Sequence, residues 1–411
     1  MQLPTISLPF LWGAASAGHQ IEGNNINSDI WLMENLSTTV FKEPSGDACN
    51  SFELWEHDLD IAKEIGLNCY RFSLEWARIE PTAGTFSKAM IDHYLRIVKG
   101  CVDRGLEPIV TINHFSNPVW FAALGGWTNP QAPEIFTRYC DEIGKYFADK
   151  LSYVLTFNEP NILRTLNVLG MPEQVWNLQS EMLELAAKTM HCKKFSGLNA
   201  CLRSDFDTIQ ENLIIGHRLA RNVLKQYNSD LQVGFSLALL DDCALGGDSV
   251  RDAKREDNYG GWLRAASEAD FVGVQNYERV VWNSEGVAPI PDDATTNKMG
   301  SWIDPTSLAN CVKYINNVTG KPVMVTEHGI ATDDDGLRCW FIESSLKELD
   351  ILRTQGMPLL GYIHWTLIDN YEWVHGYDIH FGLCEVDRST FKRTYKPSAY
   401  KYKSLIESRS Q

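Results

Sequence analysis

The sequence is short of positive charge, and this shortage excludes several classes of partner. Lys and Arg total 37 against 53 Asp and Glu, which gives a formal net charge of -16. Nucleic acids and anionic membrane surfaces are bound through basic protein surfaces. We therefore expect neither a nucleic-acid partner nor a membrane partner. The charge does not name a substrate, and nothing in the sequence indicates the oligomeric state.

Several other signals are missing as well. No apolar run reaches the ~20 residues of a membrane span, and residues 1–13 lack the basic and apolar segments of a signal peptide. The phosphate-binding patterns GxGxxG and GxxxxGK[ST] are absent, so we expect no nucleotide cofactor. The ten cysteines stand singly, without a CxxC pair or zinc-type Cys/His spacing, so no metal is expected either. Such free thiols favour a reducing compartment, and we expect a cytoplasmic protein.

Short apolar runs alternate with helical patterns along the whole chain, with no linker or low-complexity segment between them. Nearly continuous apolar runs of this length are typical of parallel strands that are buried on both faces. The predicted strands are residues 10–16, 68–74, 108–114, 153–159, 232–239, 270–277, 322–328 and 359–365.

Helical spacing fills most of the intervals between these strands. Phe52, Trp55, Leu59, Ala62 and Ile65, for example, recur at steps of three and four. Further helices are predicted over residues 91–101, 133–148, 208–227, 306–317, 337–354 and 397–407. Glycines of the kind that end helices follow several of them, namely Gly66, Gly105, Gly320 and Gly356.

Eight strands, each followed by a helix, predict an α/β protein that forms a single (β/α)8 TIM barrel over residues 1–411. The alternative is an open, doubly wound sheet, which seldom needs eight strands and usually has a glycine-rich phosphate loop after its first strand. In a barrel the active site lies at the C-terminal ends of the strands. Unusual polar residues should therefore collect at those ends.

Two glutamates stand at such ends. Glu159 closes the fourth predicted strand, in TFNEP, and Glu327 closes the seventh, in VTEHG. Strands four and seven lie on opposite sides of a narrow barrel, so the two side chains can face each other across its mouth. Facing carboxylates suit the hydrolysis of a glycosidic bond. On the strand pattern alone, a pair of unrelated surface glutamates remains an alternative.

The other strand ends carry groups that suit a sugar. Amide, carboxylate and imidazole groups bind hydroxyls, and aromatic rings stack on the C–H faces. The polar and aromatic residues at or near strand ends include Gln20, Arg71, His114, Asn158, Gln275, Tyr277, Trp365, Glu372 and Trp373.

Longer motifs resemble glycoside hydrolase family 1, the β-glucosidase-like retaining enzymes. The resemblance runs nearly end to end, through FLWGAASAGHQIEG, YRFSLEWARIEP, TFNEP, VTEHG and WTLIDNYEWVHGYDIHFGLCEVD. It implies that Glu159 is the acid/base and Glu327 the nucleophile. It also implies that Arg71 lies beside the nucleophile and that Tyr277 donates a hydrogen bond to it.

The resemblance further implies a set of residues that bind the glycone, which is the sugar unit that is transferred. Trp365 would form the platform under the ring, Trp373 would donate through its indole N–H, and Phe381 would line the wall of the pocket. The residues that would grip the hydroxyls are Gln20, His114, Asn158 and Glu372.

The chain also departs from the family pattern. Gln275 stands where asparagine is usual, and His328 replaces the asparagine after the nucleophile. The family's Trp-Asp-Leu-Pro after the histidine reads Phe-Ser-Asn-Pro at residues 115–118. Asn161 occupies a position where a tryptophan often stacks on the leaving sugar, which puts stacking there in doubt. The chain is short for the family, so trimmed loops are expected.

The expected substrate is a small β-glycoside or oligosaccharide, cleaved with retention through a covalent glycosyl-enzyme. Retention requires carboxyl groups ~5–5.5 Å apart. Arg71 should lower the pKa of Glu327, whose charge should in turn raise the pKa of Glu159. Glu372 would repel a 6-phosphate, so a β-glucoside is the default, with β-fucoside and β-galactoside close behind.

Three other functions remain as alternatives: a 6-phospho-β-glycosidase, a transglycosylase and a sugar-binding pseudoenzyme. The last is disfavoured because both glutamates are present. Residues 160–204 and 278–304 are expected to be long loops over the mouth of the barrel. The tryptophans that could line the site of the leaving group there are Trp176, Trp282 and Trp302.

Overall fold

Eight parallel strands form a closed barrel in a computed structural model that describes residues 10–409. Around the barrel their order is β1, β10, β9, β7, β5, β4, β3 and β2. Their bounds are β1 Leu11–Ala15, β2 Cys69–Ser73, β3 Glu107–Asn113, β4 Tyr153–Phe157, β5 Gln232–Ala238, β7 Val272–Asn276, β9 Val323–His328 and β10 Leu359–His364. The predicted barrel and its eight strands are confirmed. The predicted absence of a signal peptide falls mainly on residues 1–9, which lie outside the described residues.

The strands are buried on both faces, as their apolar runs predict. Every residue of β1, β2, β4, β7 and β9 is buried. The inner face of such a barrel is packed by side chains, and the outer face is covered by helices. The polar residues of β2 and β9, including Arg71 and Glu327, are therefore held inside the protein and need internal partners.

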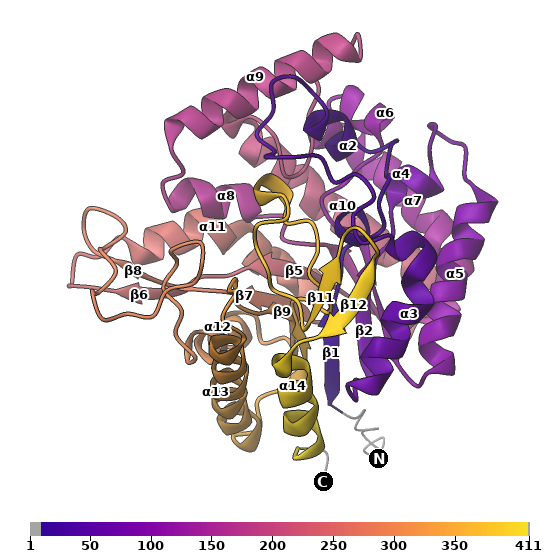
Figure 1. Cartoon of the computed structure of the whole chain (residues 1–411). Coiled ribbons are helices and arrows are strands. Elements are labelled where there is room, and N and C mark those ends of the chain that lie inside the picture. Colours follow the sequence, from indigo (N-terminus) through magenta and orange to yellow (C-terminus); the bar gives the residue numbers. More distant parts are fainter. Residues whose placement is uncertain (1–9, 410–411) are drawn as a thin grey trace, which may run out of the picture.

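A helix follows each barrel strand and packs outside it (Figure 1). These helices are α3 Ser51–Glu64, α5 Lys88–Asp103, α7 Ala132–Phe147, α10 Phe206–Tyr227, α11 Arg251–Ala265, α12 Ser307–Thr319, α13 Asp335–Thr354 and α14 Pro397–Glu407. Seven of them match predicted helices. The sequence pattern does not locate α11, because charged residues dominate it and its large buried side chains are only Tyr259 and Trp262. Gly320 ends α12 at a φ of 67°, as predicted for a helix-ending glycine.

Shorter elements fill the connections. The short helices are α1 Gly18–Ile21, α2 Asp29–Glu34, α4 Trp76–Ile79, α6 Val119–Ala123 and α8 Ile162–Val168, and the 3₁₀ turns include η5 Trp373–His375. A longer helix, α9 Glu173–Thr189, follows α8. Two small sheets lie outside the barrel: parallel β6 Asp241–Ala244 with β8 Arg279–Trp282, and antiparallel β11 Cys384–Asp387 with β12 Lys392–Tyr395.

The two segments that were expected to be long loops are therefore partly regular. Helices α8 and α9 occupy much of residues 160–204, and β8 opens residues 278–304. Figure 1 shows α8 and α9 at the end of the molecule opposite to α14 and the start of β1. They thus cover the end at which the barrel strands finish. Among residues 10–409, no helix has the length and apolar character needed to cross a membrane.

Candidate active site

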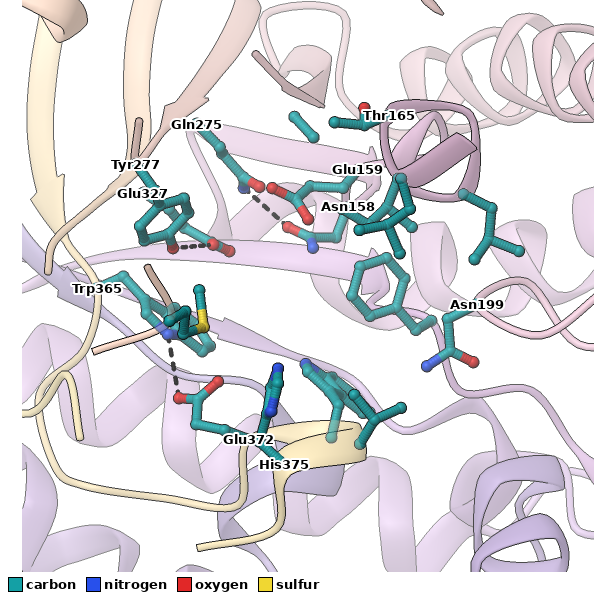
Figure 2. A pocket seen from close by; sticks show the side chains of 18 of the residues that line it. Asn158, Glu159, Thr165, Asn199, Gln275, Tyr277, Glu327, Trp365, Glu372 and His375 are labelled. Atoms are coloured by element: carbon teal, nitrogen blue, oxygen red, sulfur yellow. Dashed lines mark hydrogen bonds between the residues drawn. The ribbon is translucent and has the colours of Figure 1, made fainter. Parts of the chain in front are cut away.

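A cavity of about 320 Å³ opens at the C-terminal ends of the strands. Figure 2 shows Glu159 and Glu327 pointing into it, with Trp365 and Glu372 across from them. Arg71 is fully buried and is not among the residues that line the cavity. The other eleven predicted site residues all line the cavity: Gln20, His114, Asn158, Glu159, Gln275, Tyr277, Glu327, Trp365, Glu372, Trp373 and Phe381. The barrel thus brings together residues that are more than 300 positions apart in sequence.

Two donors hold the carboxylate of Glu327. The Arg71 guanidinium donates from Nη1 to Oε1 at 2.6 Å, and the Tyr277 hydroxyl donates to Oε2 at 2.7 Å. Tyr277 follows β7, whose Gln275 pairs in register with Glu327 of β9. Both carboxylate oxygens are therefore fixed, and one of them carries a charge-assisted hydrogen bond.

Arg71 also orders the neighbouring amide. It is fully buried, and its Nη2 donates to Oδ1 of Asn158 at 2.6 Å. Gln275 donates from Nε2 to the same oxygen at 2.8 Å. Two donors on the carbonyl oxygen fix the orientation of the Asn158 amide. Its Nδ2 group forms no hydrogen bond with any described residue and remains a donor for a ligand.

The carboxyl group of Glu159 has a different environment. It lies in the same cavity, but it forms no hydrogen bond with any described residue. Its backbone N–H donates to the Ser236 carbonyl at 2.9 Å, which fixes the start of the loop after β4. Burial, together with the charge of Glu327, raises the pKa of Glu159 well above the usual value of a glutamic acid. This environment favours a protonated Glu159.

The pKa of Glu327 differs from the prediction. Burial raises it above its usual value, although Arg71 and Tyr277 oppose the shift. The lowering influence of Arg71 is present as predicted, but desolvation of the fully enclosed carboxylate outweighs it. Because Glu327 has two donors and Glu159 has none, the shared negative charge is best placed on Glu327.

Gln20 and Glu372 lie next to each other in the lining of the cavity. Gln20 donates from Nε2 to the Tyr371 carbonyl at 2.7 Å and to Oδ1 of Asn370 at 3.1 Å. Its Oε1 is buried without a partner among the described residues. Trp365 donates from its indole N–H to Glu372 at 3.3 Å, and burial raises the pKa of Glu372 well above its usual value. A hydroxyl-rich ligand would supply the missing partners.

Aromatic rings pack around the same side. The His114 ring is stacked at 5.8 Å from Trp365 and at 6.1 Å from Trp373. Burial, followed by the charge of Arg71, lowers the pKa of His114 well below its usual value, so its imidazole is neutral. Phe381 meets Tyr277 edge to face at 5.6 Å. We call the part of the cavity that is formed by these rings together with Gln20, Asn158 and Glu372 the polar end.

The backbone is unusual at three cavity residues. Phe115, Glu159 and Trp373 have φ values of 71°, 40° and 51°, in the left-handed region that most residues avoid. Such conformations persist where the surrounding structure enforces them, and they gather at functional sites. Phe115 packs edge to face on Trp373 at 5.3 Å. The sequence gives no sign of these conformations.

The other end of the cavity has an aliphatic lining that the sequence analysis missed. Ile162 and Leu166 reach it from α8, Leu169 from the C-cap of that helix, and Leu239 and Leu240 from the chain after β5. We call these five residues the aliphatic wall. The spacing 162, 166 and 169 repeats at four and three, which was the available signal for a helical face.

The tryptophans that were candidates for this region lie elsewhere. Trp176 is buried against Phe206, and Trp282 is buried with its indole N–H on Asp242 at 2.6 Å. Trp302 lies under the guanidinium of Arg279. None of these three tryptophans is among the described residues that line the cavity. The hypothesis that they line the site of the leaving group is therefore wrong.

Comparison with known proteins decides the family. The model of glycosyl hydrolase family 1 matches residues 4–174 and 265–411, which is more than half of the chain. This chain belongs to glycosyl hydrolase family 1. The resemblance of its motifs to that family is thereby confirmed, and with it a small-molecule glycoside as the kind of substrate.

Individual relatives extend over the whole length of this family 1 hydrolase. The structure titled β-glucosidase 1317 superposes with a TM-score of 0.94 at 36% identity, covering 97% of this chain and 98% of that one. β-Glucosidase A of Thermotoga maritima is 26% identical over 454 aligned positions, covering 97% of each chain. The β-galactosidase of Pyrococcus woesei is 27% identical, covering 93% of each. An alignment of 454 positions exceeds the 411 residues present, so this hydrolase lacks segments that the T. maritima enzyme has.

A metal site does not emerge from the geometry. Within residues 10–409, no three His, Cys, Asp or Glu side chains form a group that could hold a metal ion. That the hydrolase needs no cofactor stays a prediction.

Proposed function

We propose that this family 1 hydrolase is a retaining β-glucosidase with Glu327 as the nucleophile and Glu159 as the acid/base. The observation that carries the proposal is the contrast between two carboxyl groups in one cavity. Glu327 accepts hydrogen bonds from Arg71 and Tyr277, whereas Glu159 has no donor and a pKa raised well above its usual value. Pairs of titratable groups whose environments differ in this way divide the roles of acid and base.

The proposed reaction has two steps. The Glu327 carboxylate attacks the anomeric carbon while Glu159 gives its proton to the leaving oxygen, and the glycosidic C–O bond breaks. Glu159, now ionised, then takes a proton from water, whose oxygen attacks the anomeric carbon and displaces Glu327. Arg71 and Tyr277 hold Glu327 in position for attack and stabilise it again when it leaves.

The polar end of the cavity supports an unphosphorylated glycone. Gln20 Oε1, Asn158 Nδ2 and Glu372 are available to sugar hydroxyls in the cavity that Trp365 also lines. Among the described residues that line the cavity there is no Lys or Arg, so a 6-phosphate would lose its water without gaining a cation. The named relatives favour glucose. The β-galactosidase among them keeps galactose open as a second glycone.

The proposal also covers the cellular compartment and the domain organisation. All ten cysteines are free, which supports a reducing compartment such as the cytoplasm. We also propose that the whole chain acts as one catalytic domain, because the cavity uses residues from Gln20 to Phe381.

The variant Glu327→Gly tests the nucleophile. It should lose hydrolysis of 4-nitrophenyl β-D-glucoside by about 10⁴-fold or more, because no covalent intermediate can form. Added azide fits the space left by the side chain and should restore turnover of an activated aryl glucoside. The product should be the α-glucosyl azide, identified by NMR.

The control is the exposed Glu184→Ala on α9, which should keep the activity of the unmodified enzyme. Full activity of Glu327→Gly without azide would remove Glu327 from the nucleophile role.

A further inference from the structure

The region beyond Glu159 receives the leaving group, if the proposed function holds. Helix α8 begins three residues after Glu159, and the amide of Ile162 donates to the Glu159 carbonyl at 2.9 Å. In the view of Figure 2, Thr165 and Asn199 lie beyond Glu159, on the side away from Glu327 and Trp365. A group that takes its proton from Glu159 therefore faces α8 and the aliphatic wall.

The aliphatic wall offers a continuous apolar surface. Ile162, Leu166 and Leu169 are each half-buried and lie on one face of α8, and Leu239 and Leu240 continue the surface. Two further apolar side chains line the cavity while remaining largely exposed: Met299 at 45% and Val374 at 43%. Exposed apolar side chains that gather at a cavity mark a surface for an apolar ligand.

The aromatic side chains that line the cavity come from other segments than the aliphatic wall. His114, Phe115 and Trp373 contact one another, and Trp365 stacks on His114. Neither α8 nor residues 238–240 contribute a ring to the cavity. A second sugar would therefore find no aromatic face on the aliphatic wall itself.

Polar partners are also scarce beyond Glu159. Thr165 uses its hydroxyl to donate to Asn258 at 2.9 Å. Glu278, which also lines the cavity, is hydrogen-bonded to Ser301, and burial raises the pKa of its carboxyl group. Asn199 has one buried oxygen, Oδ1, without a partner among the described residues. A second sugar carries several hydroxyls, and each that loses water without a new partner weakens binding.

Asn161 explains why the wall keeps its form. Its Nδ2 donates to the Ala238 carbonyl at 2.8 Å, and the Ala238 N–H donates back to its Oδ1 at 3.0 Å. This reciprocal pair ties α8 to the end of β5. Asn161 is buried and does not line the cavity, so the residue that replaces the stacking tryptophan anchors the apolar surface.

We infer that this enzyme acts on β-glycosides of apolar alcohols, alkyl or aryl, in preference to disaccharides. The aglycone lies along the aliphatic wall, in a cavity that Met299 and Val374 also line. The inference rests on the proposed function and names its substrate class.

The test compares kcat/KM for methyl β-D-glucoside, hexyl β-D-glucoside and cellobiose. Methanol and hexanol are leaving groups of similar acidity, so the ratio of hexyl to methyl reports contacts of the aglycone alone. Each methylene removed from water is worth about fourfold in binding. With about half of the added chain covered, we expect hexyl to exceed methyl by at least about tenfold, and also to exceed cellobiose.

Two variants test whether the apolar lining of the cavity causes the preference for hexyl over methyl glucoside. Leu166→Asn should lower the hexyl-to-methyl ratio by about fivefold or more. Met299→Gln, at an exposed position where folding is not at risk, should lower it in the same direction. The matched control is Leu178→Asn on α9, where a leucine 37% exposed lies outside the lining of the cavity and the ratio should stay unchanged.

The outcomes separate the two proposals. Hydrolysis of methyl glucoside with cellobiose preferred over hexyl glucoside would overturn the inference and leave the β-glucosidase standing. An unchanged ratio in both Leu166→Asn and Met299→Gln would also overturn it. Failure to hydrolyse any of the three substrates would instead contradict the proposed function.

Discussion

The two ends of the cavity are built on different principles. At the polar end, side chains from separate strands hold one another: Arg71 fixes Glu327 and Asn158, and Trp365 donates to Glu372. At the other end, helix α8 and the chain after β5 present aliphatic side chains, and the buried amide of Asn161 ties the two segments together. We propose that the first arrangement recognises hydroxyl positions and that the second selects for apolar character while tolerating differences in shape.

If this difference holds, the glycone and the aglycone are recognised by separate parts of the chain. The polar end combines Asn158 and Trp365, which directly follow barrel strands, with Gln20 of α1 and Glu372 at the start of η5. The aliphatic wall depends on α8, a short helix in the segment after β4. Substitutions at one end should therefore change glycone recognition without changing aglycone preference, and the reverse should hold at the other end.

The largest effect is expected at Glu159, where the two ends meet. Glu159→Ala should lower kcat/KM for methyl β-D-glucoside by ~10²–10⁴-fold, because the alkoxide must then leave without a proton. A dinitrophenyl glucoside, whose leaving group needs no proton, should lose far less. Steady-state kinetics on both substrates measure the contrast, and equal losses would count against Glu159 as the acid.

The same variant gives a pH test. Burial and Glu327 raise the pKa of Glu159, and Glu159 must be protonated in the first step. The activity of the unmodified enzyme should therefore fall as pH rises through that raised pKa. In Glu159→Ala, with the dinitrophenyl substrate, this alkaline fall should be absent.

A smaller effect is expected at the polar end. Glu372→Gln keeps the size of the side chain but replaces the carboxyl group with an amide, so kcat/KM for methyl β-D-glucoside should fall by about 10- to 100-fold. The hexyl-to-methyl ratio should not change, because the aliphatic wall is untouched. A fall in that ratio similar to the one expected for Leu166→Asn would show that the two ends do not act separately.

The smallest effect on the chemistry is expected at Asn161. Asn161→Ala leaves the N–H and carbonyl of Ala238 without their partner, and should lower the free energy of unfolding by about 2 kcal/mol. The methyl glucoside rate should stay within about threefold of the unmodified enzyme, on the additive logic of separate sites, while the hexyl-to-methyl ratio drops.

Urea denaturation measures the change in stability. The control is Asn35→Ala, which removes one exposed hydrogen bond and should change the free energy of unfolding by less than about 0.5 kcal/mol. Equal stability of both variants would contradict the anchoring role of Asn161.

Much of the polar end could be predicted from the sequence. Each barrel strand is an apolar run with a distinct end, so Glu159 and Glu327 could be placed at the mouth before the barrel was seen. Roles came from the family motifs. The direction of the pKa shift of Glu327 could not be predicted, because it depends on how completely the cavity desolvates the carboxylate.

The aliphatic wall shows why the rest could not be predicted. Helix α8 is only seven residues long, and its pattern lies inside a segment that otherwise looks like a loop. Helix α11 is hidden by its charged residues. The sequence analysis favoured Trp176, Trp282 and Trp302 for the leaving-group side of the cavity, whereas isoleucine and leucine side chains form the aliphatic wall. Which apolar residues face a cavity is decided by tertiary packing, which local spacing does not encode.

The most direct test of the account follows the anomeric configuration of the first product. Proton NMR of a fresh reaction with 4-nitrophenyl β-D-glucoside resolves α- and β-glucose before they interconvert. A covalent intermediate on Glu327 requires two displacements, so β-glucose should appear first and α-glucose only later, by mutarotation. If α-glucose appears first, the reaction inverts, and the assignment of Glu327 as nucleophile is wrong.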